Sequence, residues 1–545
     1  MLEYVMPISV FRYFEALCMI PHGSRNTKTI SDFCVAFAES YHLEHWQDAA
    51  NNVVIVSPAS PGYENAETII LQGHLDMVCE KAPGASIDMT RDALKLRMDG
   101  DFVSAEGTTL GGDDGIAIAM MLAILQETNI PHPRLECVMT ADEEIGMLGA
   151  AAFDASRLRG KRMINLDSEE EGVFTVGCAG GCTALCSFTP RWVSASGAGE
   201  AVHISIRGLT GGHSGIEIHK RRANANILLG RILQEAAKGS PLQLVRVGGG
   251  AKDNAIPVGA DAELVTPEPL SLRRTVERYA ETLRREYAET DPGLTVEVTD
   301  SVAVMCMDAD STRQIIRFLS SAPDGVQSMS ADLPGLVQTS LNLGILETAP
   351  EAISASFCVR SSQPREKEEL LERLRALTES APRRKSAKAS GDGKAAKNSG
   401  DGKTAKLSGD GKAAKASAFG DALAAKISAV GDAIAANAGL KAPDASAIAG
   451  QMTVSGDYPA WTYQPYSAMR QLCVEAFRDL YRTEPKIEAI HAGLECGYFA
   501  DKIPGLDCVS IGPDILDIHT PRERLLISSV QRVWRFLLEV LQRAK

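Results

Sequence analysis

The sequence lacks the features of membrane and secreted proteins. No apolar run in its 545 residues approaches the roughly 18 residues that a membrane-spanning helix needs. The N-terminal stretch carries Glu3 and Glu15 and has no basic region before an apolar one, so we expect no signal peptide. The 12 cysteines are dilute and irregularly spaced, which favours free thiols over a disulfide framework. We therefore expect a cytoplasmic protein with no membrane role.

Positive charge is also scarce. The chain has 56 Lys and Arg residues against 70 Asp and Glu residues, which gives a net charge of −14 at pH 7. Nucleic-acid binding needs a basic face for the phosphates, so we expect no nucleic-acid partner for the folded body. The length allows two to four domains at roughly 150 residues each. These exclusions favour a large cytosolic enzyme.

One segment departs from this average. Three nine-residue units that begin with SGDGK follow one another from Ser390, and the stretch from Arg383 to Lys426 carries a net charge of +7, so the remainder carries −21. Its Gly, Ser and Asp residues cannot offset the entropy of ordering by burial. We therefore predict a flexible, low-complexity insertion at about residues 381–450. A basic tether for an acidic partner or for nucleic acid remains an alternative.

Outside the insertion, strands and helices alternate. The apolar runs at 66–78, 134–144 and 161–170 each end in polar residues and predict buried strands, whereas 115–128 is apolar nearly all round and predicts a buried helix. Such alternation is typical of a largely parallel sheet, whose functional site lies at the carboxyl ends of the strands.

The C-terminal part repeats this theme and ends in an amphipathic helix over 522–542. The middle of the chain alternates polar and apolar residues, as antiparallel strands do. We therefore predict the α/β class: a mixed, largely parallel sheet with helices on both faces, built from residues 1–186 and 455–545. An α+β domain, residues 187–454, is inserted into it and contains the low-complexity segment.

Acidic and histidine residues gather where the predicted strands and loops end. Imidazoles and carboxylates without a cysteine suit Zn²⁺, Co²⁺ or Mn²⁺ better than a structural thiolate site. Each motif alone is more often a hydrogen-bonded core histidine or a helix cap, but five on successive elements predict a metal site. The motifs are His74-Leu75-Asp76, Gly111-Gly112-Asp113-Asp114-Gly115, Asp142-Glu143-Glu144, Asp167-Ser168-Glu169 and His491-Ala492-Gly493.

Eight motifs in one order resemble a known family, the co-catalytic zinc metallopeptidases that include aminoacyl-histidine (Xaa-His, or cytosolic non-specific) dipeptidases, carnosinase, aminoacylase and carboxypeptidase G. The resemblance continues to HTPRERL (519–525) and omits only the low-complexity segment. The motifs are GHLDMVCEK (73–81), GTTLGGDDGIAIA (107–119), TADEEIGMLGA (140–150), INLDSEEEG (164–172), GLTGGHSG (208–215), DNAIP (253–257), SGDYPAW (455–461) and HAGLECG (491–497).

The resemblance implies two Zn²⁺ ions per chain, with Co²⁺ or Mn²⁺ as substitutes. His74 and Asp167 are then expected to bind one metal, and Glu144 and His491 the other. Asp113 is expected to bridge the two, as a two-metal hydrolytic site requires. The remaining histidines, His519 among them, are interpreted as structural or surface residues.

The resemblance also implies the catalytic residues. Asp76 is expected to orient the imidazole of His74, and Glu143 to act as the general base. A metal-bridged hydroxide would attack the peptide carbonyl, Glu143 passing the proton to the leaving amine. His213, from the inserted lid domain, would stabilise the oxyanion.

Three further lid residues are implied as substrate contacts. Asn254 and Arg360 are expected to hold the substrate backbone and its C-terminal carboxylate, for which Arg offers a bidentate fork. His219 is a further candidate, for which a purely structural role stays open. Asp114 adds a negative charge beside the bridging aspartate, where many members of the family have asparagine.

The implied activity is hydrolysis of small unblocked dipeptides, including Xaa-His dipeptides such as β-alanyl-histidine. An N-acyl amino acid deacylase with the same metals and base is the alternative. A non-catalytic metal-binding scaffold would be expected to lack a ligand or the base, and the sequence lacks neither. By resemblance we also expect a homodimer.

Overall fold

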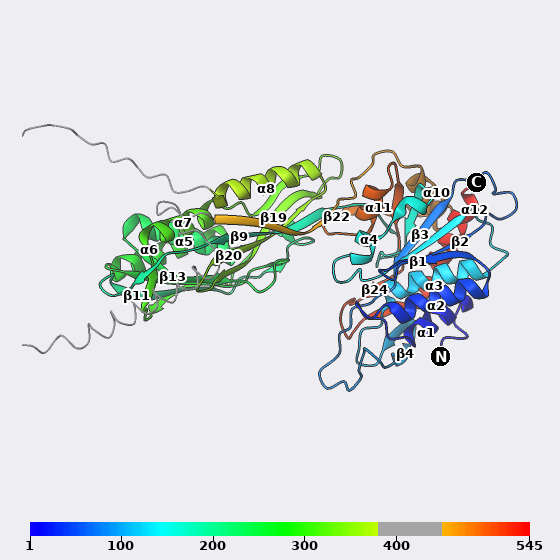
Figure 1. Cartoon of the computed structure of the whole chain (residues 1–545), viewed down its shortest axis with the longest axis horizontal. Coiled ribbons are helices and arrows are strands. Elements are labelled where there is room, and N and C mark those ends of the chain that lie inside the picture. Colours follow the sequence, from blue (N-terminus) through cyan, green and yellow to red (C-terminus); the bar gives the residue numbers. More distant parts are fainter. Residues whose placement is uncertain (380–449) are drawn as a thin grey trace, which may run out of the picture.

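The computed structural model describes residues 1–379 and 450–545. The chain forms two lobes joined by a narrow connection, and both termini lie in the same lobe (Figure 1). We call the lobe with the termini the catalytic domain and the lobe made from the middle of the chain the lid domain. The predicted low-complexity insertion falls on 380–449 and lies outside the described residues.

An eight-stranded mixed sheet forms the centre of the catalytic domain. Four of its seven pairings are parallel, and two strands, β3 and β7, have parallel neighbours on both sides. The predicted mixed, largely parallel sheet is therefore confirmed. In order across the sheet, the strands are β1 (Glu44–Gln47), β2 (Val53–Ser57), β6 (Leu135–Thr140), β3 (Ile69–His74), β7 (Arg162–Asn165), β23 (Asp507–Ser510), β8 (Val173–Cys178) and β22 (Lys486–Ile490).

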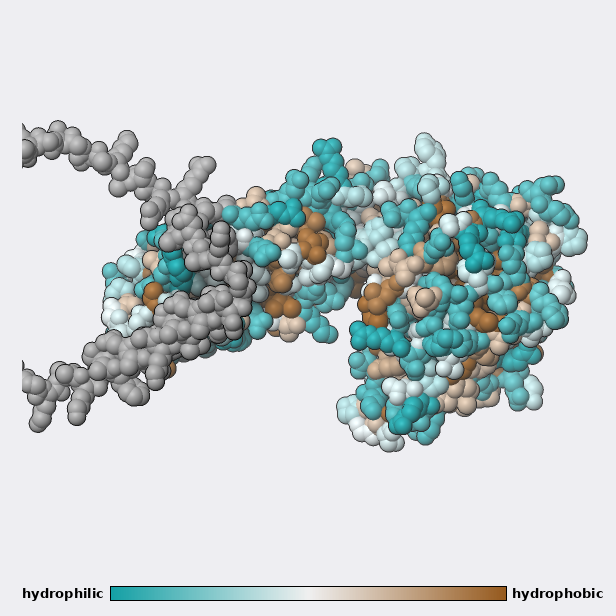
Figure 2. Space-filling view, viewed as in Figure 1, coloured by the Kyte–Doolittle hydropathy of each residue, from teal (hydrophilic) through white to brown (hydrophobic). Residues whose placement is uncertain are grey.

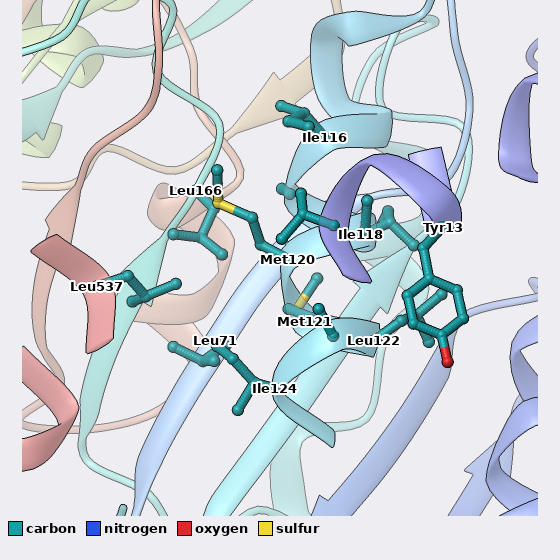
Figure 3. Close-up of a cluster of buried hydrophobic side chains, with 14 of the residues drawn as sticks. Tyr13, Leu71, Ile116, Ile118, Met120, Met121, Leu122, Ile124, Leu166 and Leu537 are labelled. Carbon is teal, nitrogen blue, oxygen red and sulfur yellow. The ribbon is translucent and has the colours of Figure 1, made fainter. Parts of the chain in front are cut away.

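Helices cover both faces of this sheet because successive strand residues point to opposite sides. In β3, Ile69 and Leu71 enter one core and Ile70 enters the other. The first core holds the predicted apolar helix, α3, whose side chains pack on all sides (Figure 3). Its helices are α1 (Ile8–Cys18), α2 (Lys28–Ser40), α3 (Gly112–Gln126), α10 (Ala468–Tyr481) and α12 (Ile527–Arg543); the other face carries α4 (Leu148–Ala152) and α11 (Cys496–Lys502).

A small four-stranded sheet joins the two ends of the chain. Its central pairing places Leu525 opposite Val103, which brings the loop before residue 524 to the side of the catalytic domain that holds the N-terminal end of α3. The strands are β24 (Ile515–Leu516), β25 (Arg524–Leu526), β5 (Phe102–Ala105) and β4 (Leu96–Asp99).

In its described residues, the lid domain is an antiparallel sheet packed against four helices (Figure 1), which agrees with the predicted α+β architecture. The helices are α5 (Ala225–Gly239), α6 (Pro269–Glu286), α7 (Ala309–Ser321) and α8 (Pro364–Glu379). The strands are β16 (Thr295–Asp300), β11 (Glu200–Arg207), β15 (Ala260–Thr266), β13 (Gln243–Gly249), β19 (Val337–Thr348), β20 (Ile353–Ser361), β9 (Gly180–Phe188) and β21 (Gly450–Tyr458), with β18 (Gly325–Met329) beside β19. The described part of the domain also contains two separate strand pairs, β10 (Trp192–Ser194) with β17 (Met305–Met307) and β12 (Gly212–His213) with β14 (Ala255–Ile256).

The chain passes between the domains along two neighbouring segments. Only Ala179 separates β8 from β9. The chain returns to the catalytic domain after β21, where a β-bridge pairs Trp461 with Cys178. The limits predicted at 186/187 and 454/455 thus fall inside β9 and β21, which both belong to the lid sheet. We propose domain limits at residue 179 and just after residue 458.

Within residues 1–379 and 450–545, no helix is both long and apolar enough to cross a membrane. The visible face is mostly hydrophilic, with hydrophobic residues in small separate groups, and an open notch separates the two lobes on one side (Figure 2).

Phe174 joins the two halves of the catalytic domain. Its ring stacks on Phe536 of α12 at 5.4 Å and meets Phe477 of α10 edge-on at 5.5 Å. We expect Phe174→Ala to lower the free energy of unfolding by about 3–5 kcal/mol because it leaves a cavity in this core. Urea denaturation measures the loss. Leu516→Ala, at an exposed site, should stay within about 0.5 kcal/mol of wild type, and an equally small loss for Phe174→Ala would contradict the assignment.

Candidate metal centre and substrate site

Three adjacent strands bring the predicted ligands to one edge of the sheet. His74 ends β3, Glu144 lies in the turn after β6, and Asp167 follows β7. Because β6, β3 and β7 are neighbours and parallel, their carboxyl ends meet. His74 Nε2 lies 3.4 Å from Asp167 Oδ1 and 3.0 Å from Asp113 Oδ1, at the N-terminal end of α3.

A second histidine approaches from the opposite side of Asp113. His519 Nε2 lies 3.2 Å from Asp113 Oδ2 and 3.1 Å from Glu144 Oε1. One oxygen of the Asp113 carboxylate therefore faces His74, and the other faces His519. This is the arrangement that a carboxylate shared by two cations adopts.

His491 lies outside this group, and we therefore propose His519 in its place as the partner of Glu144. It follows β22, the edge strand, and β7, β23 and β8 separate that strand from β3. Its Nε2 lies 2.7 Å from the Ser340 hydroxyl of the lid domain. The sequence shows that His491 follows a predicted strand, but it does not show where that strand lies in the sheet.

The donor set fits divalent cations. His74, Asp113 and Glu144 have ligand atoms that all lie within 4.8 Å of one another, as do His74, Asp114 and Asp167. Burial raises the pKa of Asp167 to about 7. A nearby positive charge is therefore needed to keep these clustered carboxylates ionised. Nitrogen and oxygen donors without thiolates suit Zn²⁺, Co²⁺ or Mn²⁺.

The raised pKa of His519 also indicates a cation site. Its hydrogen bonds with Asp113 and then Glu144 raise the pKa of its imidazole to about 11. The two carboxylates thus stabilise a positive charge at the position where they meet. A cation bound there would take the place of the imidazolium proton.

Asp76 supports both His74 and the turn after β6. His74 Nδ1 donates to the Asp76 backbone oxygen at 2.9 Å and lies 3.6 Å from the carboxylate. The same carboxylate accepts the backbone N–H of Glu143 at 2.9 Å and of Glu144 at 3.3 Å, and the Ser24 hydroxyl at 2.8 Å. Asp76 therefore positions the predicted base and one predicted ligand in addition to His74.

Glu143 lies in the loop after β6, although the strand predicted over 134–144 included it. Burial raises the pKa of its carboxyl well above the ordinary value. Among the residues that the structure describes, no hydrogen bond engages this carboxylate. A half-buried carboxylate without a partner is suited to accept a proton.

Glu523 is a residue that the motif analysis missed. It is 3% exposed, and its carboxylate accepts the backbone N–H groups of Leu110, Gly111 and Gly112 at 2.8, 3.3 and 2.7 Å. These three residues directly precede Asp113. Glu523 therefore fixes the backbone that places the bridging carboxylate, and HTPRERL, which contains both His519 and Glu523, was the signal for it.

Removing this carboxylate gives a testable expectation. We expect Glu523→Ala to lower the free energy of unfolding by about 3 kcal/mol or more, because it strands buried N–H donors. Urea denaturation of the metal-free protein measures the loss. Glu539→Ala, which removes only an ion pair with Arg543 on the surface of α12, serves as the control and should cost less than about 1 kcal/mol. Equal losses would argue against the role of Glu523.

On the lid domain, the antiparallel pairing of β12 with β14 places His213 opposite Ala255 and beside Asn254. His213 Nδ1 accepts the backbone N–H groups of Gly215 at 3.1 Å and Ile216 at 3.2 Å. The ring proton therefore sits on Nε2. Burial lowers the pKa of His213, which keeps the ring neutral and leaves Nε2–H as a donor for an oxyanion.

Arg360, in β20, is 8% exposed. Its Nη1 donates to the Tyr458 hydroxyl at 2.7 Å, and its Nε has no partner. No carboxylate among the described residues forms an ion pair with it. A buried guanidinium without a counter-ion favours an anionic ligand.

The other predicted lid residue, His219, is exposed and lines a groove of about 440 Å³ between the lid domain and β22. His491 lines the same groove from the catalytic domain. Burial, and then the charge of Arg360, lower the pKa of His491 to about 3. The structure thus groups His491 with the lid residues, whereas every predicted metal ligand that it brings together belongs to the catalytic domain.

Comparison with known proteins covers both domains. Residues 70–543 match the model of peptidase family M20/M25/M40. The cytosol non-specific dipeptidase of Escherichia coli (strain K12) is 32% identical over 547 residues, covering 99% of this chain and 98% of that protein. The solved aminoacylhistidine dipeptidase of Vibrio alginolyticus has a TM-score of 0.81 at 29% identity and covers 99% of this chain and 98% of its own. The aminopeptidase PepT of Bacillus cereus, at 13% identity, TM-score 0.54 and 99% coverage of both chains, is similar in fold alone.

Proposed function

Because the chain belongs to peptidase family M20/M25/M40, we propose that it is a dinuclear-metal dipeptidase that hydrolyses the peptide bond of unblocked dipeptides. The observation that carries the proposal is the two-sided environment of Asp113, with one oxygen toward His74 and the other toward His519. The full-length similarity to the Escherichia coli and Vibrio alginolyticus dipeptidases supports the choice of substrate class.

We assign His74 and Asp167 to one cation and Glu144 and His519 to the other, with Asp113 shared. Zn²⁺ is the proposed metal, and Co²⁺ or Mn²⁺ are substitutes that the same donors accept. When bound, such a pair of cations polarises the peptide carbonyl and lowers the pKa of a water molecule.

The side chains of the protein perform the remaining steps. Glu143 takes a proton from the attacking water and passes it to the amine nitrogen as the C–N bond breaks. The Nε2–H of His213 donates to the carbonyl oxygen as negative charge develops there. Arg360 binds the C-terminal carboxylate, and Asn254, beside His213, binds the substrate backbone. His219 is proposed as an additional contact through the groove that it lines.

The preferred substrates are proposed to be Xaa-His dipeptides, including β-alanyl-histidine, because the Vibrio alginolyticus protein is described as an aminoacylhistidine dipeptidase. We place the protein in the cytoplasm by analogy with the cytosol dipeptidase of Escherichia coli. A homodimer is the proposed assembly.

A substrate panel tests the function. Metal-loaded protein is given free dipeptides, β-alanyl-histidine among them, and N-acetyl amino acids, and the release of amino acids is measured. We expect rapid cleavage of free dipeptides and little of the blocked compounds, because Arg360 and the family resemblance favour a peptidase. Rapid cleavage of the N-acetyl amino acids alone would overturn the proposal in favour of a deacylase.

A further inference from the structure

Three polar side chains form a row across the lid sheet at the end that adjoins the catalytic domain. Ser340 of β19 is opposite Arg360 of β20, Arg360 is opposite Gly181 of β9, and Gly181 is opposite Tyr458 of β21. Residues directly opposite one another in a sheet point to the same face. Ser340, Arg360 and Tyr458 therefore face the same side, and Ser340 contacts His491 of the catalytic domain.

Gly181 allows two members of this row to meet. A Cβ atom at this position would lie 2.5 Å from the Tyr458 hydroxyl and 2.8 Å from the Val359 backbone oxygen. Without a side chain between them, Arg360 and Tyr458 reach across the intervening strand and form their 2.7 Å hydrogen bond. The glycine is thus part of the construction that pairs the guanidinium with the phenol.

The direction of that hydrogen bond leaves two donors unused. A guanidinium only donates, so the Tyr458 oxygen accepts and its own proton remains available. No acceptor for that proton is present among the described residues. The Arg360 Nε–H is also buried without a partner. The charged guanidinium and the phenol bonded to it thus offer unused donors, which are the groups that bind a carboxylate.

We propose that Tyr458 is a substrate-binding residue, whose hydroxyl binds the C-terminal carboxylate of the dipeptide together with Arg360. This inference rests on the proposed function and deepens it. The pair would make the enzyme select peptides that carry a free carboxylate directly after the cleaved bond. The alternative is a purely structural role, in which Tyr458 only packs where the chain passes between the domains. A Cβ on Gly493 would lie 2.8 Å from its ring.

The test compares Tyr458→Phe with wild type on a dipeptide and on the corresponding dipeptide amide. The variant keeps the ring and loses only the hydroxyl. On the free dipeptide we expect KM to rise about tenfold to hundredfold, as the loss of a hydrogen bond to a charged group predicts, with kcat changed less than about threefold. On the amide, which lacks the negative charge, kcat/KM should fall about threefold or less.

Tyr498→Phe is the matched control. Its hydroxyl donates to the Asp457 backbone oxygen at 3.4 Å, one residue from Tyr458, and we expect both substrates to be cleaved as by wild type. Equal losses on the dipeptide and the amide for Tyr458→Phe would assign Tyr458 to packing and overturn the inference, as would no loss on either. Wild-type protein that cleaves neither substrate would contradict the proposed function itself.

Discussion

Replacing Glu143 with glutamine is expected to lower kcat for dipeptide hydrolysis by about 10²–10⁴-fold, the range of a positioned general base. The amide cannot take the proton of water, yet it has nearly the same volume as the carboxylate. The backbone N–H of Glu143 would still donate to Asp76, so the turn that carries Glu144 should keep its place. Metal content should therefore be unchanged, and a lower kcat at equal metal content is the diagnostic result.

The measurement combines initial rates with metal analysis of the same samples. Glu170→Gln, at an exposed position three residues after Asp167, is the matched control and should retain wild-type rates. A Glu143→Gln variant that retains more than about a tenth of wild-type kcat would contradict the role of Glu143. Loss of metal in the same variant would instead make Glu143 a ligand.

Replacing His519 with alanine should remove one metal ligand and most of the activity. We expect the metal content to fall from two toward one per chain. We expect kcat to fall about a hundredfold or more, because a catalytic cation lowers the activation barrier by several kcal/mol. Mass spectrometry of dialysed protein counts the metals.

His491→Ala is the decisive comparison, because motif analysis and structure disagree about these two histidines. His491 contacts Ser340, whereas His519 lies beside Asp113 and Glu144. We expect His491→Ala to retain two metals, whatever its effect on substrate binding. Two metals in His519→Ala, or one in His491→Ala, would restore the assignment that the sequence suggested.

The ligands that could be predicted from sequence are those at the ends of central strands. His74, Glu144 and Asp167 each follow an apolar run of the kind that forms a buried strand, and parallel neighbours bring such ends together. Asp113 begins a helix that is apolar nearly all round, a pattern as clear as the strands. Local sequence therefore contained enough to place these four residues at one edge of the sheet.

His519 and Glu523 could not be placed in this way. They lie in the loop between β24 and β25, strands of two and three residues that show no periodicity. The pairing of β25 with β5 sets their position beside Asp113, and such long-range pairing is not visible in local sequence. The domain limits that we propose were also not visible in local sequence. The chain leaves one sheet at the end of β8 and enters the other at β9 after a single residue.

The central claim is that two cations, held by the residues around Asp113, are required for dipeptide hydrolysis. Its most direct test is a titration of metal-stripped protein with Zn²⁺ while the turnover of a dipeptide is recorded. Turnover should be negligible without metal and should reach its plateau at two equivalents of Zn²⁺ per chain. Full turnover without metal, or a plateau at one equivalent, would contradict the claim.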